Sequence, residues 1–168
     1  MVEVFDEWIK ENSDNPQVFI RYCINSLELF YNNYSRVDGF GKRSPFVLPL
    51  ICVSNNVDLD PLDELRTCVP HKFIEYNINN TSWDEFLSDK FFSNFLTDME
   101  NKPDECKQCC YENICDGGNY GHRFNSTDVS FNNPSVYCDG LKVFWHRIIH
   151  FLLLHGFSKE RLKQVLLS

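Results

Sequence analysis

Four cysteines stand within ten residues, in the run "CKQCCYENIC" from Cys106 to Cys115, and two adjacent glycines follow after one further residue. Much of the remaining chain is a mixture of acids, asparagines and aromatic residues. Thiols this close together constrain the local fold, because thiolates that share one centre need tight turns between them. The run therefore indicates a metal or cluster site built from a loop.

The cysteine spacing selects a set of candidate ligands. Cys106, Cys109 and Cys115 follow the order C-x2-C-x5-C, in which a tight turn can aim the first two sulfurs inward and the third returns from the next turn. A fourth ligand is needed, and Cys138 is the natural candidate after 22 intervening residues. Cys110 is expected to point away if Cys109 points in, since adjacent side chains of an extended stretch diverge. Spacing alone leaves zinc and an iron–sulfur cluster both open.

Composition excludes several classes of partner. The 168 residues carry a formal net charge of −8, which argues against a nucleic-acid partner, because binding to phosphates is driven mainly by Lys and Arg. The longest apolar run, "FLLL", is far too short to span a membrane. The acidic, polar start lacks the features of a secretion signal. Eight cysteines are then expected to be reduced thiols in the cytoplasm, where clustered thiols more often bind metal than form disulfides.

The periodicity of apolar residues predicts an α+β fold that is rich in helix. Helices are expected over residues 4–11, 17–34, 83–99 and 139–155, with a last short helix from 159. Ser82 and Glu85 match a capping box, and Gly156 is a suitable helix stop. The apolar run 46–53 predicts a strand that a turn joins to a return segment, which makes a short β-hairpin. The cysteine loop lies between helical segments.

Two features beside the cysteines suggest support for the loop. Gly117 and Gly118 lack a Cβ, so they permit positive φ and a close approach of backbone to a bulky inorganic centre. Their N–H groups could also donate to cluster sulfides. His122 and Arg123 are expected to brace the loop or to meet a carboxylate.

The run from Cys106 to Phe144 closely resembles the SPASM segment of radical S-adenosylmethionine (SAM) peptide maturases. The matching residues are Cys106, Cys109, Cys115, Gly117, Gly118, His122, Arg123, Asn133, Pro134, Ser135, Val136, Tyr137 and Cys138. The resemblance implies an auxiliary [4Fe-4S] cluster on Cys106, Cys109, Cys115 and Cys138.

The resemblance departs from the family at one ligand position. Asn119 stands where the family has a further cysteine that usually serves a second auxiliary cluster. Cys52 and Cys68 lie where the family often supplies additional ligands, although Asp63 replaces a usual glycine between them. A second site at Cys52 and Cys68 therefore stays open as an alternative.

The chain lacks the catalytic motif of these maturases, so no catalytic residue is assigned. The C-x3-C-x2-C triplet is absent, because Asn113 stands where a third cysteine would follow Cys106 and Cys110. A complete eightfold barrel also needs roughly 200 residues or more. The sequence is therefore expected to be the C-terminal part of a maturase, as a split subunit, a remnant or a truncated product. We divide it into a helical segment (1–45), a hairpin and helical linker (46–103), and a SPASM-type cluster loop with C-terminal helices (104–168).

The functional hypothesis is an auxiliary role in radical SAM modification of a ribosomally synthesised peptide. The expected partners are a radical SAM barrel and a precursor peptide. Two alternatives come from other classes. One is a stand-alone zinc–thiolate module for protein binding, and the other is a simple electron carrier.

Overall fold

The computed structural model describes residues 1–12, 18–32, 51–53, 59–61, 76–77, 79–90, 93, 97, 101–125, 127 and 130–167. Its elements are α1 (Val2–Asn12), α2 (Arg21–Asn32), β1 (Ile51–Val53), β2 (Leu59–Pro61), α3 (Trp83–Ser88), α5 (Asp104–Lys107), α6 (Glu112–Cys115), the 3-10 turn η3 (Tyr120–His122), α7 (Cys138–Leu154) and α8 (Lys159–Leu167).

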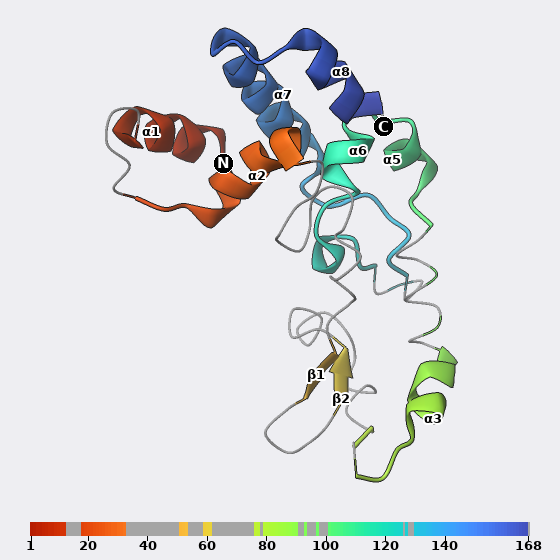
Figure 1. The fold of residues 1–168 in the computed structure, drawn as a ribbon. Coiled ribbons are helices and arrows are strands. Elements are labelled where there is room, and N and C mark those ends of the chain that lie inside the picture. Colours follow the sequence, from red (N-terminus) through yellow and green to blue (C-terminus); the bar gives the residue numbers. More distant parts are fainter. Residues whose placement is uncertain are drawn as a thin grey trace.

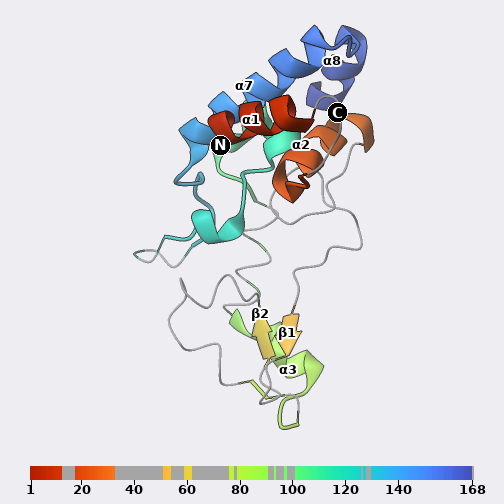
Figure 2. The same cartoon turned by 90° about the vertical axis from the view of Figure 1, so that its left-hand side faces the viewer.

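The elements gather at two ends of the molecule. Helices α1, α2, α6, α7 and α8 lie together at one end, whereas β1, β2 and α3 lie at the other (Figure 1). The view turned by 90° gives the same separation and places α1 alongside α7 (Figure 2). The cysteine loop, which includes α5 and α6, therefore belongs to the helical end.

Helix α7 is the central element of the core. Its apolar residues recur at helical spacing, as the sequence predicted, and five of its side chains are buried: Leu141, Phe144, Trp145, Ile148 and Leu152. The helix ends at Leu154, and Gly156 follows with φ of 83°, which is the left-handed conformation that favours glycine at a helix end. No helix within the described residues is long and apolar enough to cross a membrane.

The N-terminal helices pack against α7 and α8. Phe5 of α1 is fully buried and meets the rings of Phe144 and Phe151 edge-on, with centroids 6.0 and 5.6 Å away. Helix α2 contributes Phe30, whose ring lies edge-on to that of Phe157 with the ring centroids 6.2 Å apart. The buried core residues are Phe5, Cys23, Leu29, Phe30, Ile114, Leu141, Phe144, Trp145, Ile148, Leu152, Leu162 and Val165.

The predicted fold class, α+β with a short β-hairpin as its β part, is wrong. The residues that the structure describes are mainly helical. The strands of the described residues are β1 and β2, which pair antiparallel over three residues each, and one isolated bridge joins Asn125 to Ser130. Two strands of this length cannot form a layer that supports a core, and all the core residues given above come from the helical end.

The helix predicted over residues 83–99 is interrupted at Asp89, and the described residues beyond it, Lys90, Ser93 and Thr97, are helical again. Its start is confirmed, because the Ser82 side chain accepts a hydrogen bond from the Glu85 N–H. However, α3 ends at Ser88, and Asp89 has a non-helical ψ of 130°. The Asp89 carboxylate instead accepts a hydrogen bond from the Tyr76 hydroxyl at 2.7 Å. The apolar pattern of residues 83–99 could not predict this contact between Tyr76 and Asp89.

Replacing Phe5 by Ala should destabilise the helical end. Truncating a fully buried aromatic residue typically costs about 3–5 kcal/mol in the free energy of unfolding. Val4, next in sequence, is 54% exposed, so V4A is the matched control and should change stability by less than about 0.5 kcal/mol. Urea unfolding followed by circular dichroism measures both variants, and equal losses would contradict the packing described for α1.

Candidate metal centre

Cys106 and Cys115 lie on two short helical turns, and Cys109 lies between these turns. The α5 turn begins after Pro103 and carries Cys106, whereas the α6 turn ends at Cys115. Between them, the Cys109 N–H donates to the Cys106 carbonyl at 3.0 Å. The Asn113 side chain ties α6 to the end of α8 by donating to the Leu166 carbonyl at 2.8 Å. These two bonds help to fix the segment that carries the three cysteines.

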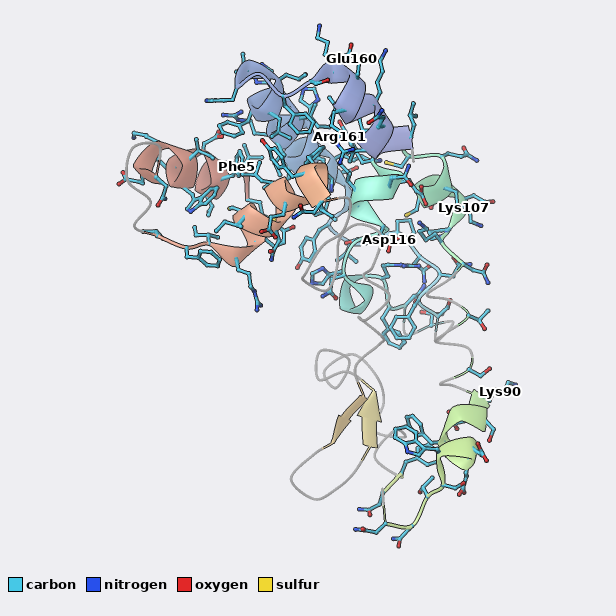
Figure 3. The ribbon with its side chains drawn as sticks, viewed as in Figure 1. Phe5, Lys90, Lys107, Asp116, Glu160 and Arg161 are labelled. Atoms are coloured by element: carbon cyan, nitrogen blue, oxygen red, sulfur yellow. The ribbon has the colours of Figure 1, made fainter. Side chains whose placement is uncertain are left out.

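Three successive residues after Cys115 have positive φ. Asp116, at the end of α6 (Figure 3), has φ of 51°, and Gly117 and Gly118 have φ of 78° and 77°. A Cβ on Gly118 would lie 3.1 Å from Leu141 Cδ1 and 3.5 Å from Ser135 Cβ. The positive φ expected at the glycines is found, and the lack of a side chain allows this loop to pass close to α7.

The fourth candidate, Cys138, is placed by the start of α7. Its N–H donates to the Ser135 carbonyl at 2.9 Å. The buried Ser135 hydroxyl accepts from the Tyr137 N–H, and the Val136 N–H donates to the His122 carbonyl. These bonds hold the segment before α7 against the loop that follows the glycines.

The structure brings the four thiols around one cavity. Cys106, Cys109, Cys115 and Cys138 all line a space of about 220 Å³. Leu141 and Trp145 of α7 also line it, as do Gly117, Pro134 and Ser135. Among the described residues, no group of three or more His, Cys, Asp or Glu side chains is arranged to hold a single metal ion. The assignment of these four cysteines as ligands stays a prediction.

The thiols interact electrostatically. Burial is the main cause that raises the pKa of Cys115 to about 12. The other three thiols of the cavity each raise it further through charge repulsion, whereas a hydrogen bond from the Trp145 side chain lowers it. The pKa of Cys106 is raised too, first by burial and then by Cys138 and Cys109. Such mutual effects need short separations, and any metal or cluster that binds here must displace protons.

Helix α7 contributes two cavity residues that the sequence reasoning did not assign to the site. Trp145 is fully buried and lies two turns after Cys138, and Lys142 lies one turn after it. Lys142 and Trp145 lie four and seven residues after Cys138, so the three side chains lie on one side of the helix. This spacing could have identified both residues from the sequence.

A half-buried ion cluster supports the loop from outside. Lys102 bonds to Glu112 and to Asp116, the latter at 2.8 Å, and these side chains are 20–25% exposed. Burial alone would lower the pKa of Lys102, but its bonds to the two carboxylates outweigh burial and raise it. The cluster thus joins the segment before α5 to both ends of α6.

The loop residues His122 and Arg123 occupy different environments. His122 is exposed, and its ring meets that of Tyr137 edge-on at 4.8 Å. Arg123 is only 1% exposed, and its Nε donates to the Asn133 carbonyl at 3.1 Å. Each residue thus contacts the segment that leads into α7, and their role in supporting a cluster stays a prediction.

The proposed second site cannot be placed among the described side chains. Cys52 lies on β1, of which only the backbone is described, and Cys68 lies outside the described residues. The domain boundary at 45/46 also lies outside them. The second site and the domain boundaries therefore stay predictions.

Comparison with known proteins gives matches among solved structures. No protein-family profile and no curated protein matches the chain. A structure of native anSMEcpe with bound AdoMet aligns with a TM-score of 0.71 and 23% identity. A structure of anSMEcpe with bound AdoMet and the Kp18Cys peptide aligns with a TM-score of 0.70 and 22% identity. The enzyme is an anaerobic sulfatase-maturating radical SAM enzyme with a SPASM domain.

The alignments cover 90% of this chain and 40% of the enzyme chain. The chain therefore spans less than half the length of the structures it matches. At this level of identity the likeness shows the fold. It confirms the resemblance to the SPASM region of radical SAM maturases at that level.

Replacing Gly118 by Ala should destabilise the loop. A left-handed conformation costs an L-residue about 1–2 kcal/mol, and the added methyl group would crowd Leu141 of α7. Gly140 is the matched control, because it lies in α7 with nothing within 4 Å of an added Cβ, and Ala is favoured over Gly in helices. Urea unfolding should show a loss for G118A and no loss for G140A. A G118A variant as stable as the parent would contradict the loop conformation.

Proposed function

We propose that this chain is an auxiliary SPASM-type module that binds one [4Fe-4S] cluster and supports radical SAM modification of a ribosomally synthesised peptide. Cys106, Cys109, Cys115 and Cys138 would hold the cluster. The observation that carries the proposal is the common cavity that these four thiols line. Once bound, such a cluster can accept and pass on single electrons.

The residues of the cavity fit a thiolate-bound cluster. Four cysteines form the donor set that [4Fe-4S] clusters use. The apolar wall of Leu141 and Trp145 limits water at the site, which is one of the factors that set a cluster's potential.

The fold supports a peptide-modifying context. The similar region belongs to an enzyme whose structures contain AdoMet and, in two cases, an 18Cys peptide. This chain corresponds to 40% of that enzyme. Catalysis would therefore need a radical SAM domain with a C-x3-C-x2-C motif, which this sequence does not carry. A precursor peptide is the partner that we propose for the assembled system.

Removing one ligand should impair cluster binding. Protein purified and reconstituted without oxygen should contain about four irons and four sulfides per chain. C138A should hold less iron and sulfide and should lose them faster to a chelator. Cys110 is the matched control, because it is exposed and lies outside the cavity lining; C110A should behave as the parent does.

Several results would contradict the proposal. Iron and sulfide contents that are equal in C138A and C110A, with equal loss to the chelator, would show that Cys138 is no ligand. A colourless preparation that contains zinc in place of iron would favour the zinc–thiolate alternative.

Removing the cluster should loosen the cysteine loop more than the helical core. Ligation supplies folding free energy to the elements that it joins, and α5 and α6 are only four residues each. Hydrogen exchange should therefore increase over residues 104–118 after chelation. It should change little in α1 and the centre of α7, which have the buried Phe5 and Phe144. Uniform changes across all of these elements would contradict this prediction.

The partner is tested separately from the cluster. A cluster-loaded chain should retain a radical SAM protein that carries the C-x3-C-x2-C motif, or its precursor peptide, in an anaerobic pull-down. A loaded chain that retains neither, while it exchanges electrons with a small carrier protein, would favour the electron-carrier alternative.

A further inference from the structure

A buried guanidinium lies behind one wall of the cavity. Arg123 follows η3, is 1% exposed, and is among the largest fully buried side chains of the described residues. Burying a charged group costs several kcal/mol unless charges or hydrogen bonds compensate it. Its Nε bond to the Asn133 carbonyl fixes the direction of the side chain.

The contact with Gly117 places the guanidinium close to the cavity. Gly117 lines the cavity together with the four cysteines. A Cβ on Gly117 would lie 3.2 Å from Arg123 Nη1 and 3.5 Å from Cζ. The planar group therefore lies directly against the backbone that forms this wall, and only a residue without a side chain leaves room for it.

The cations near the cavity have different surroundings. Arg123 is buried against the Gly117 wall. Lys142, which also lines the cavity, is exposed, so water screens its charge. Arginine keeps its charge at any ordinary pH.

We propose that Arg123 is the buried charge compensator of the centre held by the four cysteines, and that it makes the reduction potential of that centre less negative. A [4Fe-4S] cluster with four thiolates carries a net charge of about −2 when oxidised and about −3 when reduced, and net charge is one of the factors that set its potential. A nearby cation stabilises the reduced form more, because that form has the larger negative charge. The inference rests on the proposed function.

The experiment measures the midpoint potential of the reconstituted protein by dithionite titration followed with electron paramagnetic resonance. R123Q should shift the potential to a more negative value, and R123K should retain most of the parent value because it keeps the charge. R147Q is the matched control. Arg147 is partly buried and pairs with Asp6 of α1 at 2.7 Å, outside the cavity lining, so its removal should leave the potential unchanged.

The outcomes separate this inference from the proposed function. A parent protein that takes up no iron and sulfide overturns the proposed function before any potential is measured. With a loaded parent, a R123Q potential equal to that of the parent overturns the inference, as do equal shifts in R123Q and R123K. If R123Q assembles no cluster while R123K does, the requirement for charge is supported. If neither variant assembles one and both keep the parent's circular dichroism spectrum, charge is not what the site needs.

Discussion

The site depends on one buried junction between segments that are distant in sequence. Ile114 of α6 and Leu141 and Trp145 of α7 are buried in the same core, and Trp145 lines the same cavity as Cys115. Cys138 is the first residue of α7. The packing of this helix therefore positions the Cys138 thiol beside the loop that contains the other three cysteines. The packing of the hydrophobic core thus completes the cavity that the cysteine loop begins.

Two opposing effects act on the buried thiols of the cavity. Burial raises the pKa of Cys106 and of Cys115, which favours neutral thiols when nothing binds them. The buried guanidinium of Arg123 acts in the opposite direction and favours negative charge at Cys106. The arrangement therefore suits an occupant that replaces protons and brings its own charge, as a cluster does.

Local patterns predicted the parts of this structure that local interactions determine. The apolar spacing of α7, the cap at Ser82 and the positive φ of the glycines each follow from neighbouring residues. The predicted fold class was wrong because a short apolar run indicates strand pairing but does not reveal the extent of the sheet, which here is two strands of three residues among the described residues. At the break, Asp89 bonds to Tyr76, and the buried Arg123 lies against the Gly117 backbone. Such tertiary contacts do not appear in sequence periodicity.

The central claim is that sulfur atoms from four cysteines bind one iron–sulfur centre. Anomalous scattering at the iron edge, measured on crystals grown without oxygen, tests it most directly. We expect one compact iron feature in the cavity, in contact with the Sγ atoms of Cys106, Cys109, Cys115 and Cys138. Iron density elsewhere in the chain, or a single zinc ion bound by these thiols, would contradict the account.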